Sequence, residues 1–153
     1  MNAELEELYQ QVILDHSKRP RNFGTLPDAV HVHGDNPSCG DEIDLHVKFA
    51  PDGAVEDVKF TGQGCAISQA SASLMTLKLK GRPRADAEKL ARAFHDLVTQ
   101  PAFEAPRELG DLRLLAGVQK FPQRVKCAML AWRAFEQALQ EPDGPAPVTT
   151  EGD

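Results

Sequence analysis

The sequence NPSCGDEIDLHVKFAPDGAVEDVKFTGQGC, residues 36–65, carries the clearest structural pattern in the chain. Apolar residues at positions 43, 45, 47 and 49 alternate with polar ones, which is the period of a half-buried β-strand. The following Ala50-Pro51-Asp52-Gly53 is typical of a turn, and residues 55–61 are interpreted as the returning strand. We therefore predict an antiparallel hairpin from residues 42–49 and 55–61.

A thiol and a carboxylate stand immediately before this hairpin. Pro37 favours an extended conformation at Asn36, and Gly40 permits a sharp or left-handed backbone step. If the segment is otherwise extended, Cys39 and Asp41 point to the same side, since side chains of an extended chain alternate. The two side chains would then be two ligands of a metal site that needs two more.

We predict that the missing ligands come from two distant thiols, so that the site contains Cys39, Asp41, Cys65 and Cys127. Zinc accepts thiolate and carboxylate ligands in a tetrahedron. Iron–sulfur clusters also use thiolates, but normally take all four ligands from cysteine. The spacing of these residues follows no general zinc pattern, so the residues alone leave zinc and iron open.

The rest of the chain is predicted to be mostly helical. Apolar residues at helical spacing predict helices over residues 4–17, 65–80, 86–99 and 122–140, with Pro122 at the first position of the last one. Residues 18–36 are interpreted as a loop because glycine and proline interrupt them, and residues 112–115 as a short helix. We expect one domain over residues 1–140 and a disordered acidic tail over residues 141–153, which contain three prolines and two glycines.

Composition excludes several classes of function. The net charge of −6 argues against nucleic acid as a main partner, because phosphate binding needs a basic surface. No apolar run approaches the roughly 18 residues of a membrane span, so we expect no membrane partner. Three cysteines without an export signal favour a metal or redox-thiol role in the cytosol over a disulfide framework.

The helical positions of two cysteines argue against a simple core role, although a single cysteine is most often a small buried hydrophobe. On the last predicted helix, Cys127 lies roughly 130° from the centre of the apolar stripe. Cys65 lies nearly opposite the stripe of its own helix. Both are near helix N-termini, where the helix dipole lowers the pKa of a thiol. Arg124 and Lys126 add positive charge, although a solvated helix face explains them equally well.

Neither the histidines nor the glycines suggest a second site. His31-x-His33 is the most tempting pair, but its place in a predicted loop favours a surface role, and His46 falls on the polar positions of the first hairpin strand. Gly62-Gln63-Gly64 is too short for a phosphate cradle and is interpreted as clearance around Cys65.

Four stretches resemble the U-type iron–sulfur assembly proteins, which comprise SufU, IscU and the N-terminal domain of NifU. They are DHSKRPRNFG (residues 15–24), NPSCGD (36–41), GQGCAISQAS (62–71) and RVKC (124–127). The resemblance implies an α/β (α+β) fold of the SufE/NifU type: a compact single domain with a small antiparallel sheet packed on helices and a metal site exposed at one end.

Two features place the chain in the SufU branch of this family. Lys126 stands where scaffold members usually carry a histidine, and residues 81–101 resemble an extra segment of that branch. The branch implies a zinc-dependent sulfur acceptor that takes persulfide sulfur from a cysteine desulfurase of the SufS type and serves cytoplasmic iron–sulfur assembly machinery. Such a protein is a partner-dependent sulfurtransferase, and we expect residues 81–101 to contact the desulfurase.

The resemblance also implies individual roles. Cys39 would accept the sulfur after a residue of the partner has displaced it from zinc, Arg124 would support the released thiolate, and Asp41 would complete the resting site. Two alternatives stay open. One is a scaffold that builds a [2Fe–2S] cluster on the same ligands and passes it to apo-proteins; the other is a purely structural zinc domain.

Overall fold

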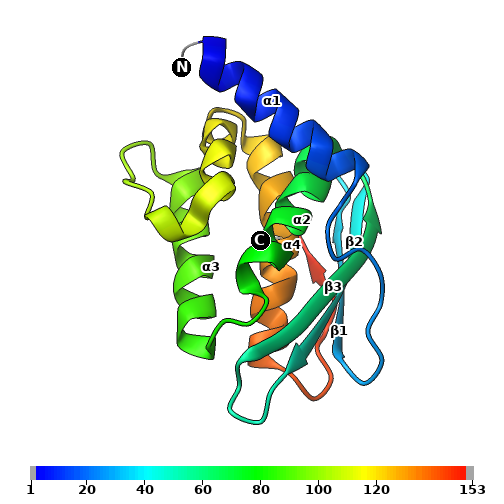
Figure 1. The fold of residues 1–153 in the computed structure, drawn as a ribbon. Helices are drawn as coiled ribbons and strands as arrows, with labels where there is room; N and C mark the ends of the chain where they lie inside the picture. Colours follow the sequence, from blue (N-terminus) through cyan, green and yellow to red (C-terminus); the bar gives the residue numbers. More distant parts are fainter. Residues whose placement is uncertain (1–2, 151–153) are drawn as a thin grey trace.

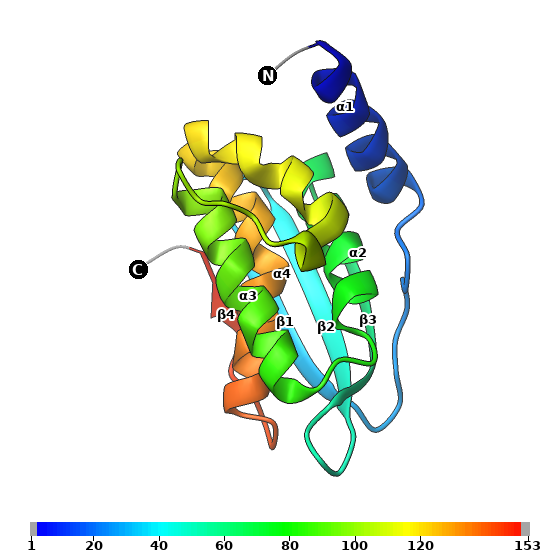
Figure 2. The ribbon, with the colours of Figure 1, turned by 60° about the vertical axis from the view of Figure 1, so that its left-hand side comes forward.

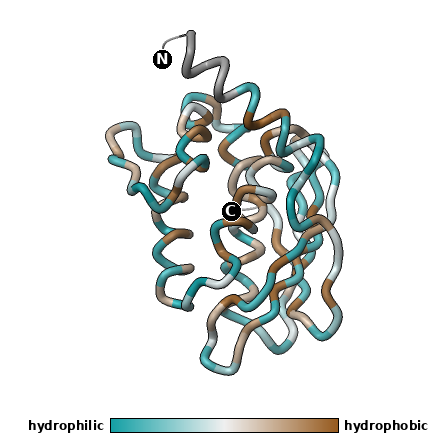
Figure 3. Tube along the Cα trace, in the orientation of Figure 1, coloured by the Kyte–Doolittle hydropathy of each residue, from teal (hydrophilic) through white to brown (hydrophobic). Residues whose placement is uncertain are grey.

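The predicted hairpin forms the middle of the structure. The computed structural model describes residues 3–150, with side chains from Gln10 onward. Strand β2 (Asp41–Phe49) pairs antiparallel with β3 (Val55–Gln63). Buried residues alternate with more exposed ones along most of both strands, as predicted. Figure 3 shows this alternation as changes of hydropathy along the strands.

Two further strands lie where the sequence predicts none. β1 (Val30–Asn36) pairs antiparallel with β2, and β4 (Val148–Thr149) pairs parallel with β1, so the sheet is mixed and has the order β3-β2-β1-β4. The prediction of a loop is wrong for residues 30–36, and the structure differs from the predicted disordered tail at residues 148–150; residues 151–153 lie outside the described part. β1 ends in Gly34, Asp35 and Asn36, which have weak strand propensity, and β4 has only two residues, so both strands depend on pairing with a neighbour.

Helices cover one face of the sheet (Figure 1, Figure 2). The four predicted helices are present with closely similar bounds: α1 (Ala3–Lys18), α2 (Ala66–Leu79), α3 (Arg84–Thr99) and α4 (Pro122–Gln140). The short helix predicted at residues 112–115 lies within a longer 3-10 segment, η1 (Arg107–Lys120), whose helical geometry breaks at Gly110. Among residues 3–150, no helix is both long and apolar enough to cross a membrane.

Helix α4 is the central element of the core. It packs against β1, β2, α2, α3 and η1, so its middle is covered on all sides and each residue from Cys127 to Trp132 is buried. Trp132 stacks on Phe94 of α3, with ring centroids 4.8 Å apart. Residues outside the apolar stripe of this helix, such as Cys127 and Leu130, are therefore buried as well.

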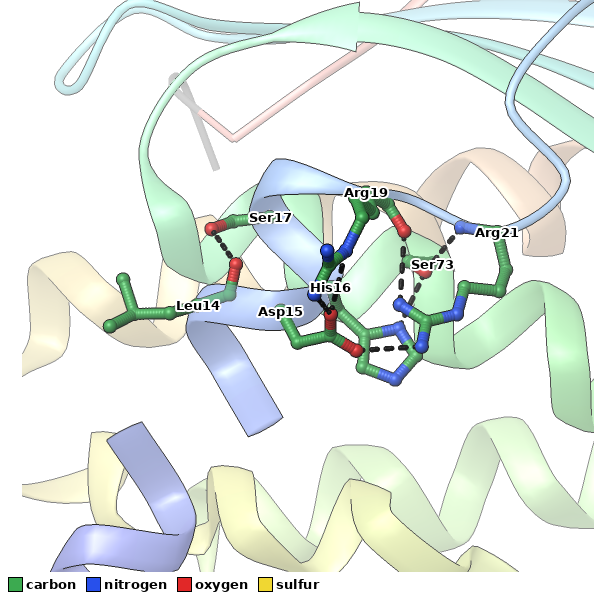
Figure 4. Close-up of polar contacts among 7 residues, drawn as sticks. All are labelled: Leu14, Asp15, His16, Ser17, Arg19, Arg21 and Ser73. Atoms are coloured by element: carbon green, nitrogen blue, oxygen red, sulfur yellow. Dashed lines mark hydrogen bonds and ion pairs between the residues drawn. The ribbon is translucent and has the colours of Figure 1, made fainter. Parts of the chain in front are cut away.

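A polar network fastens the end of α1 to α2 (Figure 4). Ser73 accepts a hydrogen bond from the Arg21 backbone N–H at 2.8 Å, and its hydroxyl donates to Nδ1 of the buried His16 at 2.7 Å. Burial lowers the pKa of His16, which favours the neutral imidazole that accepts this bond. Outside, hydrogen bonds from Arg19 and Arg21 lower the pKa of Asp15 to about 2. The start of the segment between α1 and β1 is thereby fixed against α2.

We expect Ser73→Ala to lower the free energy of unfolding by about 1–3 kcal/mol, because His16 and the Arg21 N–H both lose their partner. Ser17→Ala is the matched control, since the Ser17 hydroxyl makes an exposed hydrogen bond to the Leu14 carbonyl. Chemical denaturation followed by circular dichroism measures both variants. Equal losses in the two would contradict this role of Ser73.

Candidate metal centre

Cys39 lies in the tight turn that joins β1 to β2. Asn36 and Asp41 form the last pair of the two strands, so residues 37–40 make the turn, and the Cys39 N–H donates to the Asn36 carbonyl at 3.2 Å. Gly40 has a φ of +69°, in the left-handed region that favours glycine. The turn leaves Cys39 exposed. A turn, and not the alternation of an extended segment, therefore brings Cys39 close to Asp41.

Asp41 occupies a fixed position at the start of β2. The residue is 1% exposed, and its carboxylate accepts hydrogen bonds from Cys65 and Asn36. Oδ1 accepts from the backbone N–H of Cys65 at 2.8 Å, and Oδ2 accepts from Nδ2 of Asn36 at 3.0 Å. The Cys65 thiol lies 3.9 Å from Oδ2. Because a buried carboxylate needs such donors or a cation, the place of Asp41 is tied to the end of β1 and to the start of α2.

Cys65 is the N-cap residue of α2. Its backbone is extended, with φ of −70° and ψ of 163°, and its Sγ accepts a hydrogen bond from the Ser68 N–H at 3.4 Å. The thiol takes the role that serine, threonine or aspartate usually has at a helix start. It is half-buried and lies close to the positive end of the helix dipole, as the sequence predicts.

Cys127 reaches the site from the second turn of α4. It is 2% exposed, and its Sγ lies 3.3 Å from Sγ of Cys39 and 3.4 Å from Nδ2 of Asn36, which donates to it. Burial, with hydrogen bonds to Cys39, Asp41 and Cys65, raises the pKa of the Cys127 thiol. A thiolate here therefore needs a compensating positive charge. The prediction that Cys127 avoids the core is wrong, because α4 has neighbours on all sides.

Three of the four predicted ligands stand in one compact group. The ligand atoms of Cys39, Asp41 and Cys127 all lie within 4.8 Å of one another; together with Cys65 beside them, we call them the thiol–carboxylate cluster. In a tetrahedral zinc site with bonds of about 2.3 Å to sulfur, neighbouring ligand atoms are about 3.8 Å apart. The spacing of the group, and its donor set of sulfur and carboxylate oxygen, fit such an ion.

Asn36 is a site residue that sequence reasoning missed. It is fully buried, and its Nδ2 bridges Asp41 and Cys127. Outer groups of this kind fix the orientation of metal ligands. Its place before Pro37 indicates only an extended backbone, and its partner Cys127 is 91 residues away, so the sequence contains no signal for this contact.

Other residues singled out in the sequence lie elsewhere. Arg124 is exposed on the first turn of α4, three residues before Cys127, and its supporting role stays a prediction. His31 and His33 lie on β1 and not in a loop. Both imidazoles contact Oδ1 of Asp44, at 2.8 Å and 3.0 Å, on the exposed face of the sheet and apart from the cluster.

Gly64 gives clearance to Asp41 rather than to Cys65. Its φ is +147°, and a Cβ placed on it would overlap the Asp41 carboxylate. Gly62 is confined in the same way, because a Cβ there would meet the backbone of Glu42. The two glycines thus let the end of β3 lie directly against the start of β2, where the cluster forms.

Several known proteins are similar to this chain in sequence. The family model described as NifU-like N terminal domain matches residues 8–141. The chain is 46% identical over 143 residues to the zinc-dependent sulfurtransferase SufU of Bacillus subtilis, which covers 94% of this chain and 97% of that protein. It is also 46% identical over 138 residues to the iron–sulfur cluster assembly scaffold protein IscU of Streptococcus pyogenes, with 90% of this chain and 86% of the relative covered.

A solved structure shares the fold. The chain resembles an iron–sulfur cluster assembly scaffold protein for the SUF system from Fervidobacterium islandicum with a TM-score of 0.78, at 34% identity and over 88% of this chain and 98% of the other. This likeness confirms the predicted α+β fold of one compact domain.

We expect Gly64→Ala to cost about 1–3 kcal/mol through its backbone conformation alone and to displace the Asp41 carboxylate, so that metal affinity falls about tenfold or more. Gly117→Ala is the matched control, because Gly117 has no positive φ and a Cβ there meets nothing within 4 Å. Denaturation and competition with a zinc chelator measure the two effects. Unchanged zinc affinity in Gly64→Ala would contradict the clearance role.

Proposed function

The chain belongs to the NifU-like N-terminal domain family, and from this membership we propose that it is a zinc-dependent sulfur acceptor for iron–sulfur cluster assembly. It takes persulfide sulfur from a cysteine desulfurase of the SufS type and depends on that partner for its activity. The 46% identity to a Bacillus subtilis protein named as a zinc-dependent sulfurtransferase supports this function.

The graded exposure of the three thiols carries the proposal. Cys39 is exposed, Cys65 is half-buried and Cys127 is buried. An acceptor thiol must reach a sulfur atom held by another protein, whereas a thiol that only binds metal need not. Cys39 stands on a turn beside Gly40, where a partner can approach it, and we therefore assign it as the acceptor.

The transfer is an exchange between a thiolate and a persulfide. The Cys39 thiolate attacks the outer sulfur of the desulfurase persulfide, so that one S–S bond forms on Cys39 while the S–S bond on the desulfurase breaks. The desulfurase cysteine leaves as a thiolate, and no external oxidant or reductant is required. We assign Arg124, exposed one turn before Cys127, as a supporting cation for the anionic sulfur.

The donor set favours zinc as the resident metal. Cys39, Asp41, Cys65 and Cys127 would hold the ion, and bound zinc supplies the positive charge that keeps the thiols deprotonated. Asn36 holds two of these ligands in place. Iron–sulfur clusters normally use four cysteines, whereas here a carboxylate takes the fourth place.

One alternative function is favoured by a specific comparison. The relative from Streptococcus pyogenes, equally 46% identical, is named as a scaffold. In that case the same ligands would carry a [2Fe–2S] cluster and pass it to apo-proteins. Lys126 argues for the acceptor role, because scaffold members of the family usually carry a histidine at this position.

Two observations support the proposed partner and compartment. We assign residues 81–101, which form α3 and the turns beside it, as a contact with the desulfurase, because α3 buries one side and leaves the other exposed. All three cysteines are free, which suits the cytoplasm, where thiols stay reduced. The sulfur would pass from there to the downstream iron–sulfur assembly machinery.

Cys39→Ala should abolish the stimulation of the desulfurase while leaving complex formation largely intact, because it removes the accepting sulfur, which is also one of the four proposed ligands, and leaves the other three in place. Ser38→Ala, in the same exposed turn, is the control and should stimulate normally. Alanine release from cysteine measures the activity, and co-elution measures the complex. If Cys39→Ala still accelerates alanine release to the wild-type level, Cys39 is not the acceptor.

Protein purified without added iron should contain one zinc ion per chain and show no visible absorbance, since the filled d shell of Zn²⁺ gives no colour. Elemental analysis and an absorbance spectrum measure this directly. A coloured cluster that forms under anaerobic reconstitution and passes to an apo-acceptor would support the scaffold alternative instead.

A further inference from the structure

The last described residue, Thr150, contacts Asn36, the residue that bridges two members of the thiol–carboxylate cluster, although it is remote in sequence. β4 runs parallel to β1, with Val148 opposite Gly34, and the Thr150 N–H donates to the Asp35 carbonyl at 3.1 Å. This pairing places the Thr150 side chain beside Asn36. Thr150 is 6% exposed, and its Oγ1 donates to Oδ1 of Asn36 at 2.7 Å.

All polar atoms of the Asn36 side chain are thereby used. Nδ2 donates to Oδ2 of Asp41 at 3.0 Å and to Sγ of Cys127 at 3.4 Å, while Oδ1 accepts from Thr150. Asn36 itself is fully buried. The amide thus connects the C-terminal strand on one side with two members of the cluster on the other.

The direction of this amide matters for the cluster. If the amide turned over, Oδ1 would face the carboxylate of Asp41 and the sulfur of Cys127, which are both electron-rich. In the observed direction the Thr150 hydroxyl donates to Oδ1, while Nδ2 faces the two acceptors Asp41 and Cys127, so every group of the amide has a partner of the right kind. Without that hydroxyl, Oδ1 would be buried without its partner, which is unfavourable.

We propose that Thr150 is a positioning residue of the thiol–carboxylate cluster: its hydroxyl holds the Asn36 amide so that Nδ2 stays on Asp41 and Cys127. The metal in this proposal rests on the proposed function, whereas the orientation of the amide does not. The strand β4 is then part of the site, and its docking on β1 sets how firmly two ligands are held.

The orientation is tested on the full-length chain by nuclear magnetic resonance. In wild type, the side-chain NH₂ of Asn36 should exchange slowly with solvent, and Thr150→Val should accelerate this exchange tenfold or more. Thr150→Ser keeps the hydroxyl and should restore slow exchange. Thr149→Val makes the same change on the exposed neighbour in β4 and should leave it slow. Slow exchange in Thr150→Val, with circular dichroism as in wild type, would overturn the proposal.

The consequence for metal is tested by the rate of zinc transfer to a chelator. Loss of an outer partner of a ligand commonly weakens a metal site tenfold to a hundredfold, and Thr150, one contact further out, should change the rate by about threefold to tenfold. In an Asn36→Ala background the Thr150→Val change should have no further effect, because Thr150 acts through Asn36. An equal effect in both backgrounds would contradict this route.

The two tests separate the proposals. If wild-type protein holds no zinc, the proposed metal function fails, and the amide exchange still decides the role of Thr150. If zinc is held and the exchange of Asn36 is the same in wild type and Thr150→Val, the positioning role fails while the function stands.

Discussion

The buried carboxylate of Asp41 is the interaction on which the site depends. A carboxylate at 1% exposure is unfavourable unless donors or a cation surround it. The donors here come from the start of α2 and the end of β1, through Cys65 and Asn36. Asn36 in turn reaches α4 at Cys127. The hydrogen bonds around the Asp41 carboxylate thus bring the end of β1, the start of α2 and α4 together. Gly64 is needed because a larger residue there would overlap that carboxylate.

Most of the fold could be predicted because its elements carry local patterns. The hairpin of β2 and β3 alternates in sequence, and Pro122 marks the start of α4 as the structure has it. β1 and β4 were not predictable in this way, because β1 ends in Gly34, Asp35 and Asn36, and β4 has two residues. Such strands form because they pair with a neighbouring strand, and the pattern of a single sequence does not show which segments will pair.

The candidate site, like the fold, could be predicted from the sequence only where the evidence is local. The sequence indicates the four ligands through residue type and helix-start position, and the family motifs add their roles. It misjudges the surroundings of Cys127, because an apolar stripe presumes that a helix has one covered side, whereas α4 is covered on all sides from Cys127 to Trp132. It shows neither the bridging amide of Asn36 nor the exposure that singles out Cys39. These are properties of contacts between distant segments.

The N-cap residue of α2 links metal binding at the cluster to the stability of this helix. The Sγ of Cys65 is both a candidate ligand and the acceptor for the Ser68 N–H at the first turn of the helix. A thiolate accepts hydrogen bonds more strongly than a thiol, so whatever keeps Cys65 deprotonated also strengthens that turn. By thermodynamic reciprocity, a well-formed first turn must then favour the same occupant by an equal free energy. An ion held by Cys65 and the first turn of α2 would therefore stabilise each other.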